Sequence, residues 1–149
     1  MTGQEAAFAV LPELTEANRH FWQGGRQGRL VLLRCGDCGY WLHPPIPRCP
    51  RDGSKNLAPE AVSGRGTVAS YTVNHHQWLP GFEPPYVVAL VELVEQEGLR
   101  LTTDLVNCDL DAAAIGLAVR VVFRHVADPH GDIWLPLFEP DPQAPDAGR

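Results

Sequence analysis

Two short motifs hold the residues of this sequence that are best suited to bind a metal. The first runs from Cys35 to Cys38 and the second from Cys49 to Asp52, so two residues separate the candidate ligands in each. This spacing forms a tight turn that directs both ligand atoms to one point. Zinc accepts a carboxylate oxygen at nearly the same distance as an imidazole nitrogen, so Asp52 can stand where a fourth cysteine is usual. The pattern predicts a structural zinc site with three thiolates and one carboxylate, a weaker set than four thiolates.

Other interpretations of the two motifs remain open at this point. His43 could supply the fourth ligand in place of Asp52, although it lies between the motifs and directly before two prolines. The three cysteines could also persist as small buried apolar residues in a module that has lost its metal. An iron redox centre fits less well, because it relies on four thiolates. A disulfide is disfavoured because the chain shows no secretory signal.

Length and composition limit the function classes. With 149 residues, 44% of them hydrophobic, the chain can form one modest core and one small additional module. The net charge of −6 argues against a protein whose main role is to bind a nucleic-acid backbone. No apolar run is long enough to span a bilayer, and the N-terminus lacks a basic region followed by an apolar one. We therefore expect a cytoplasmic protein that binds neither membranes nor nucleic acid.

The residues around the metal motifs predict a helix followed by a hairpin. After a loose N-terminal arm, apolar side chains recur at helical spacing over residues 13–24, where Gly24 and the following Gly25 provide a stop. Residues 29–34 are rich in branched apolar side chains and should form the strand that leads into the first motif. Residues 40–42 should form the returning strand. A hairpin that carries two such motifs is typical of a rubredoxin-like zinc ribbon.

Beyond residue 57 the sequence becomes a series of strands separated by turns. An acidic residue, three alanines and a final glycine predict one helical turn at 109–116. Residues 133–138 suggest an additional edge strand. Several short strands with a helical turn before the last long one follow the order of an OB-fold, a small β-barrel. The four main strand segments are 67–73, 85–93, 99–106 and 117–126.

These patterns predict a mainly β chain, in which an N-terminal helix and a rubredoxin-like zinc ribbon are followed by a C-terminal OB-fold barrel. The expected parts are the arm and helix (1–28), the zinc ribbon (29–56), the OB-fold (57–140) and a disordered tail (141–149).

The order of these parts carries a family resemblance. A helix, a zinc ribbon, the segment Ser63 to Val73 and the segment Pro80 to Leu93 together resemble the zinc-ribbon OB-fold proteins associated with acyl-CoA enzymes. The likeness covers roughly residues 11–138. It implies assembly with thiolase-like enzymes: as a subunit of a lipid-transfer-protein-type aldolase in steroid side-chain breakdown, as a bridge between thiolase and hydroxymethylglutaryl-CoA synthase, or fused to an enoyl-CoA hydratase.

The resemblance implies a non-catalytic accessory subunit of a thiolase-fold aldolase that cleaves steroid side-chain acyl-CoA. The expected assembly is a heterotetramer of two plus two subunits, in which the partner holds most of the substrate and this chain stabilises the partner and helps to shape the acyl-CoA channel. The sequence itself offers no recognisable pair of nucleophile and base. One alternative is an acyl-CoA-binding adaptor that joins two enzymes. Another is a single-stranded nucleic-acid binder, which would need a basic groove with exposed aromatic side chains.

Aromatic and histidine side chains are the candidates for contact with a partner or an acyl-CoA. Some fall in the loop after the first barrel strand, where loops of this fold carry binding. Others lie in the helix and the ribbon hairpin, where packing within the chain is an equal alternative. The candidates are Phe21, Trp22, Tyr40, Trp41, His75, His76, Trp78 and Phe82.

Overall fold

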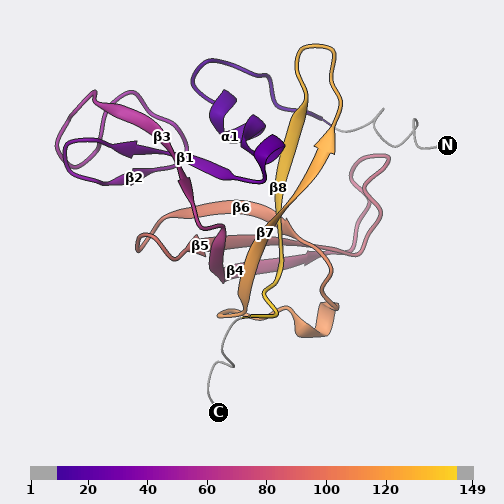
Figure 1. Ribbon diagram of the computed structural model, residues 1–149. Helices are drawn as coiled ribbons and strands as arrows, with labels where there is room; N and C mark the ends of the chain where they lie inside the picture. The colour runs from indigo at the N-terminus through magenta and orange to yellow at the C-terminus, as the bar shows by residue number, and fades with distance from the viewer. Residues whose placement is uncertain (1–9, 144–149) are drawn as a thin grey trace.

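Strands dominate the computed structural model, which describes residues 10–143 (Figure 1). The expected N-terminal arm and the end of the expected disordered tail lie outside the described residues. None of the described helices is long and apolar enough to cross a membrane. The elements, with η for a 3-10 helix, are α1 (Arg19–Gln23), η2 (Gly24–Gln27), β1 (Leu30–Cys35), β2 (Trp41–Leu42), β3 (Leu57–Val62), β4 (Arg65–Asn74), β5 (Tyr86–Leu93), β6 (Arg100–Leu105), η3 (Leu110–Ala112), β7 (Ala118–Val126) and β8 (Ile133–Pro140).

The helix α1 is shorter than the sequence pattern predicts, because a side chain competes with the backbone at its start. Helical spacing predicted residues 13–24, but α1 begins only at Arg19. The Asn18 side chain accepts a hydrogen bond from the Thr15 N–H at 2.8 Å and donates one to the Glu13 carbonyl at 2.9 Å. These bonds hold the preceding residues in a turn, which offers the backbone an alternative to the helix.

The two glycines that were expected to end the helix begin η2 instead. This 3-10 helix ends at Gln27 and is capped by Gly28, whose left-handed φ of +68° is most favourable for glycine. At Gly25, a side chain would collide with Phe123 on β7 and Trp134 on β8. Gly25 therefore allows the helical segment to pack closely on the barrel, and Figure 1 shows α1 beside β8.

The ribbon contains a three-stranded antiparallel sheet in the order β2-β1-β3. Its central strand, β1, pairs with β3 from Leu30↔Val62 to Cys35↔Leu57. The strand β3 begins at Leu57, the residue at which the sequence suggested that the barrel begins. The chain therefore completes the ribbon sheet before it enters the barrel at β4.

The barrel is closed, with the strand order β4-β5-β6-β8-β7, which confirms the predicted OB-like architecture. A register shift between Val68 and Ser70 bends β4 so that the strand follows the curve of the barrel. The prediction of an edge strand at 133–138 was wrong. β8 lies between two neighbours, pairing with β7 from Val126↔Ile133 to Val119↔Pro140 and meeting β6 at Leu105↔Phe138.

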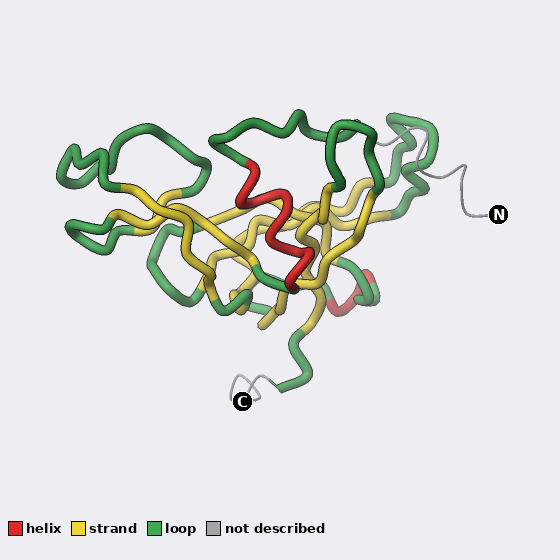
Figure 2. Tube along the Cα trace, turned by 45° about the horizontal axis from the view of Figure 1, so that its top comes forward, coloured by secondary structure: helices red, strands yellow, loops and turns green. Residues whose placement is uncertain are grey.

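One hydrophobic cluster connects the barrel, the helix and the ribbon. Alternate residues of β5, Val87, Ala89 and Val91, point into the barrel and are almost fully buried. The same cluster includes Leu30 and Leu32 of β1. Figure 2 shows the helix lying across the strands, with the loops of the ribbon motifs at one end of the molecule. The first half of β1 is therefore part of the barrel core, while its last residue reaches the metal motifs.

Candidate metal centre and partner-facing surfaces

The two metal motifs fold into matching turns. In each, the residue that follows the second candidate ligand is a glycine with a left-handed backbone, φ +79° at Gly39 and +72° at Gly53. The N–H of each glycine donates to the carbonyl of the first cysteine of its motif, Cys35 or Cys49, at 2.9 Å. Because the turns match, Asp52 occupies the position in the second motif that Cys38 occupies in the first.

The structure brings Cys35, Cys38, Cys49 and Asp52 together. One ligand atom from each residue lies within 4.8 Å of all the others. The Sγ atoms of Cys38 and Cys49 are 3.5 Å apart, and the Cys35 Sγ is 3.6 Å from an Asp52 oxygen. Zinc bound tetrahedrally at ordinary bond lengths separates two sulfurs by about 3.8 Å and a sulfur from an oxygen by about 3.6 Å. These two separations are therefore close to those around a tetrahedral zinc ion.

Backbone groups in the first turn support an anionic sulfur. Burial opposes ionisation of Cys35, but N–H groups of Cys38 and Asp37 donate to its sulfur, and the pKa of the thiol falls below its ordinary value. The pKa of Asp52 is also lowered, chiefly because its carboxylate accepts a hydrogen bond from the Ser54 N–H at 2.9 Å. These donors favour the charged forms of two of the four candidate ligands.

The thiol of Cys38 shows how the close approach of several acidic groups opposes ionisation. The Tyr40 N–H lowers the pKa of Cys38, but burial and hydrogen bonds with Cys49, Cys35 and Asp52 outweigh it and raise the pKa to about 11. Four acidic groups this close cannot all be ionised unless a positive charge lies among them. A divalent cation supplies that charge, so the donor set suits a metal chemically as well as geometrically.

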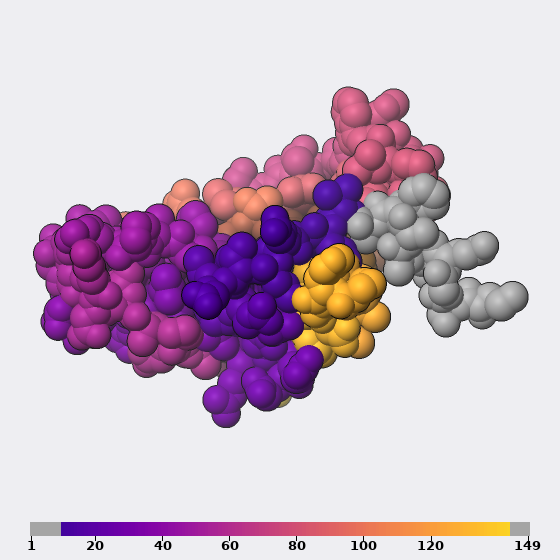
Figure 3. Space-filling model, turned by 90° about the horizontal axis from the view of Figure 1, so that it is seen from above, coloured from indigo at the N-terminus to yellow at the C-terminus, as the bar shows by residue number. Residues whose placement is uncertain are grey.

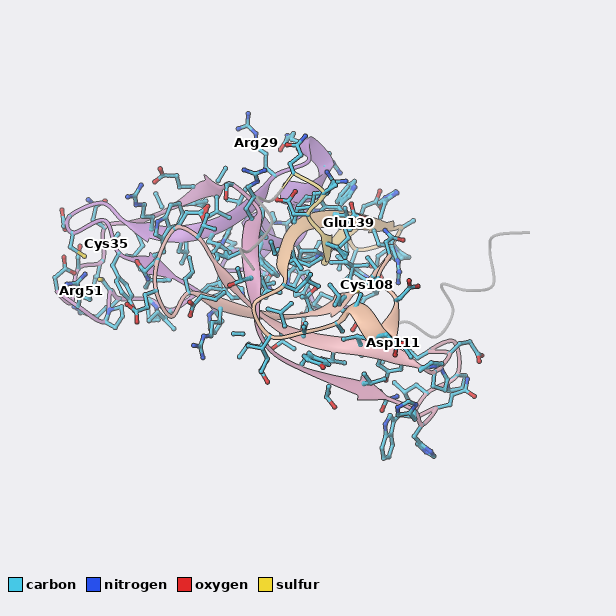
Figure 4. All side chains as sticks on the ribbon, turned by 90° about the horizontal axis from the view of Figure 1, so that it is seen from below. Arg29, Cys35, Arg51, Cys108, Asp111 and Glu139 are labelled. Atoms are coloured by element: carbon cyan, nitrogen blue, oxygen red, sulfur yellow. The ribbon has the colours of Figure 1, made fainter. Side chains whose placement is uncertain are left out.

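A second set of polar residues fixes the two turns relative to one another. The Asp37 carboxylate accepts hydrogen bonds from the Ser54 hydroxyl and from the Asn56 side-chain amide, the latter at 3.3 Å. The Gly36 N–H donates to the Asn56 carbonyl at 2.8 Å. Such outer contacts orient the ligands around a metal. Figure 4 shows Cys35 and Arg51 at this tip of the ribbon, whereas Cys108 lies on the barrel.

His43, the alternative fourth ligand, is not part of this cluster. Its ring lies 4.7 Å from the ring of Phe21, measured between centroids. Burial, and to a smaller extent the neighbouring His20, lower the pKa of His43 to about 4. His43 is therefore a neutral side chain packed at the junction of the ribbon and the helix.

The aromatic candidates in the helix and ribbon differ in their burial. Phe21 and Trp41 are each only 6% exposed and belong to the main core, which is the packing alternative left open by the sequence. The backbone of Trp41 is held by the Gln96 side chain, through hydrogen bonds of 2.9 and 3.0 Å. Trp22 and Tyr40 are half-buried, so each can also offer part of its ring to a partner.

The candidates in the loop between β4 and β5 are exposed. This hairpin extends beyond the barrel in Figure 1 and protrudes from the surface in Figure 3. Trp78 is 69% exposed, and its indole N–H donates to the Asn74 side chain at 2.8 Å. His76 packs against the Trp78 ring with centroids 4.4 Å apart. We call the exposed apolar residues of this loop, with its two histidines, the hairpin tip: His75, His76, Trp78, Leu79 and Phe82.

The sequence did not reveal a groove where the helix, the ribbon hairpin and the outer face of the barrel meet. It has a volume of about 690 Å³. Its lining includes Trp22 and Pro45 from the helix and the ribbon hairpin, and Val88 and Leu135 from the barrel. Its acidic residue, Asp104, is half-buried. The sequence signal for this groove was an acidic residue, Asp104, within the predicted strand 99–106.

Family models match both parts of the chain. Residues 22–58 match the rubredoxin-like zinc ribbon domain of ChsH2, and residues 59–124 match its C-terminal OB-fold domain.

Relatives and a solved structure agree with the family models. The chain is 43% identical over 129 residues to a probable enoyl-CoA hydratase alpha subunit of Thermomonospora curvata, covering 87% of this chain and 39% of that protein. It is 37% identical to the 3-oxo-4,17-pregnadiene-20-carboxyl-CoA hydratase alpha subunit of Mycobacterium tuberculosis, covering 87% of this chain and 40% of that protein. The chain thus spans about two fifths of the length of these curated relatives.

This chain superimposes on a chain of the Ltp2-ChsH2(DUF35) aldolase with a TM-score of 0.75 and 42% identity, covering 87% of this chain and 98% of that one. The chain therefore belongs to the ChsH2 family of DUF35 proteins, which join a rubredoxin-like zinc ribbon to an OB-fold.

Proposed function

We propose that this protein is a non-catalytic accessory subunit of a thiolase-fold aldolase that cleaves steroid side-chain acyl-CoA. The observation that carries the proposal is the structural match to a chain of the Ltp2-ChsH2(DUF35) aldolase, because it covers 98% of that chain at 42% identity. The name of the mycobacterial relative, a pregnadiene carboxyl-CoA hydratase subunit, supports a steroid acyl-CoA as the substrate class. In this account the partner holds the catalytic residues and most of the substrate.

The metal cluster has a structural role in this proposal. Cys35, Cys38, Cys49 and Asp52 hold zinc, and no ligand position is left for a reacting water. The bound ion supplies charge compensation and cross-links the two turns. The ribbon tip, which we define as the two motif turns (35–39 and 49–53) with Tyr40 and Leu42 beside them, is too small to be held by apolar contacts alone. The ion therefore keeps Tyr40 and the neighbouring loops in a fixed position for a partner.

The hairpin tip is the main contact with the partner in this proposal. Trp78 and Phe82 expose apolar rings, and exposed aromatic residues are typical anchors of protein interfaces. The indole N–H of Trp78 is already bonded within the loop, so burial of the ring in a partner costs no unpaired donor. We place two copies of this chain on a dimer of the partner, in a heterotetramer.

A second candidate function is an adaptor that joins two enzymes of acyl-CoA metabolism. The ribbon tip and the hairpin tip lie at opposite ends of the molecule in Figures 1, 3 and 4, so the two ends can contact different proteins. The match to about two fifths of two hydratase alpha subunits favours a hydratase as one of the two enzymes. The acidic net charge of −6 weighs against the nucleic-acid alternative.

Size-exclusion chromatography with light scattering tests the proposed association. This chain is mixed with the Ltp2 subunit of the aldolase that it resembles, and each protein is also run alone. The proposal predicts one peak with the mass of two plus two subunits. Separate elution at micromolar concentrations would contradict the accessory role. A complex that forms with a hydratase but not with the aldolase subunit would instead favour the adaptor.

A further inference from the structure

The barrel has a weakly paired junction between β6 and β8. These parallel strands share one register pair, Leu105↔Phe138, and the Val106 N–H donates to the Phe138 carbonyl at 2.8 Å. Nearer the start of β6, a side chain makes the connection, because the Thr103 hydroxyl donates to the Pro136 carbonyl at 2.8 Å. Pro136 has no backbone N–H to offer in return. The strand edges that face each other along 100–103 and 133–136 are therefore not joined by a regular ladder.

The groove described above lies over this junction. Its lining includes residues of both strands, and its volume of about 690 Å³ suits several side chains of an extended peptide. The walls are mainly apolar and come from the helix, the ribbon hairpin, β5 and β8: Phe21, Trp22, Pro45, Val88, Leu90 and Leu135. A mainly apolar groove over a sparsely paired strand junction can hold the side chains of an extended peptide segment.

Asp104 gives the groove a charge preference. Burial raises the pKa of its carboxyl group, and the positive charge of Arg124 only partly offsets this rise. Arg100, which also lines the groove, is paired with Glu92 at 3.0 Å. The ion pairs among the described residues all involve other carboxylates. A half-buried carboxylate that forms no ion pair is costly, so a positively charged side chain is the occupant that complements it.

We infer that the groove binds an extended segment of the thiolase-like partner, in which a lysine or arginine side chain lies beside Asp104 and apolar residues flank it. This inference rests on the proposed function, because the segment belongs to the same partner. The anionic phosphates of a CoA ligand would meet the Asp104 carboxylate and be repelled, so a peptide with a basic residue fits the charge of the groove better.

Hydrogen exchange of the wild-type chain, alone and with the Ltp2 subunit, tests the inference without a mutation. We expect amides at 100–104 and at 134, 135 and 137 to exchange at least about tenfold more slowly in the complex. A complex that leaves both segments unprotected would overturn the inference while the proposed function stands. Protection by an acyl-CoA alone, or by raising the concentration of this chain alone, would overturn it in favour of a small ligand or a second copy.

A charge reversal provides a matched second test. Asp104→Arg should weaken binding of the Ltp2 subunit about 30-fold or more, because it sets two like charges against each other in a partly buried site. Glu97→Arg makes the same charge change on the exposed turn between β5 and β6, and should leave binding unchanged. Asp104→Asn, which disturbs the fold less, should weaken binding by a smaller factor. Equal affinities for all variants would contradict the inference, whereas no binding by the wild type would contradict the proposed function.

Discussion

The ribbon tip and the barrel are held together by different forces. At the tip, the buried residues are Cys35, Leu42 and Cys49, and two of these three are candidate metal ligands. In the barrel, a continuous apolar cluster includes Val91 and Phe138, both fully buried. Apolar burial of this extent stabilises a fold by itself, whereas the tip depends on its polar ligands.

The strand β1 connects the two regions and shows where one kind of stabilisation gives way to the other. Leu30 and Leu32 are buried in the barrel cluster, while Cys35 at the end of the same strand belongs to the tip. Loss of the metal should therefore release the end of β1 and the two motif turns without unfolding the barrel. Loss of an apolar side chain from the barrel core should instead destabilise the barrel and leave the two motif turns bound to the metal.

The largest effect is expected from Cys49→Ser. Binding of zinc by small cysteine sites contributes on the order of 10 kcal/mol to local folding, so removal of one thiolate should release the ion and the tip. Metal content by mass spectrometry should fall, and amides near Gly39 and Gly53 should exchange rapidly while barrel amides remain protected. Cys108→Ser is the matched control and should retain the metal. Full metal content in Cys49→Ser would contradict the assigned ligand set.

A core substitution in the barrel, Phe138→Ala, should lower the free energy of unfolding by about 3–5 kcal/mol, since it removes a large side chain that is fully buried. Urea unfolding followed by tryptophan fluorescence measures this change. Val94→Ala, at a position 65% exposed, should change stability by less than about 0.5 kcal/mol. The folded fraction of Phe138→Ala should still bind one zinc ion. Loss of zinc and unfolding of the barrel in a single transition of Phe138→Ala would mean that the two regions are not separable.

His43 makes stability depend on pH at the junction of the two regions. Its pKa is about 4 in the folded chain against 6.5 for an exposed histidine, so the unfolded chain binds the proton more readily between these values. Its contribution is therefore complete above about pH 6.5 and is lost progressively as the pH falls toward 4. At pH 5 the loss is about 2 kcal/mol.

The variant His43→Leu should remove this part of the pH dependence. Urea unfolding at pH 7.5 and pH 5 should show a smaller difference for His43→Leu than for the wild type. Acid also weakens metal binding by protonating thiolates, so His130→Leu, at an exposed position, serves as the reference. Identical pH dependence in both variants would show that His43 is not buried in its neutral form.

The smallest effect on stability, less than about 0.5 kcal/mol, is expected from Trp78→Ala, because 69% of this side chain is exposed. Its effect on the partner should be larger, with at least about tenfold weaker binding, as expected for a central aromatic anchor. Isothermal calorimetry with the Ltp2 subunit measures it. Ile115→Ala, at a position 71% exposed on another loop, should bind normally. Equal affinities would place the interface elsewhere.

Local patterns in the sequence predicted the features that depend on neighbouring residues. The spacing of the two motifs located the cluster from Cys35 to Asp52, and runs of β-branched or aromatic residues separated by turns located β4 to β7. The start of α1 was missed because the Asn18 side chain bonds to Thr15 and Glu13, a competition that helical periodicity does not register.

Features built from distant segments could not be predicted in the same way. The position of β8 inside the barrel depends on its pairing with β6, about thirty residues earlier in the chain. The groove is lined by five elements, α1, the ribbon hairpin, β5, β6 and β8, that no local pattern connects. From sequence alone, Phe21 and Trp41 fit an exposed or a buried position equally well. Both are buried in the structure, because they pack into the same apolar cluster as the barrel residues.

The central claim is that this chain completes an aldolase whose catalytic residues lie in its partner. The most direct measurement is the rate of retro-aldol cleavage of a steroid side-chain acyl-CoA by the Ltp2 subunit, with increasing amounts of this chain. The account predicts little activity from either protein alone and a rate that rises until the partner is saturated. Full activity of the Ltp2 subunit without this chain, or no increase in rate when a complex has formed, would contradict it.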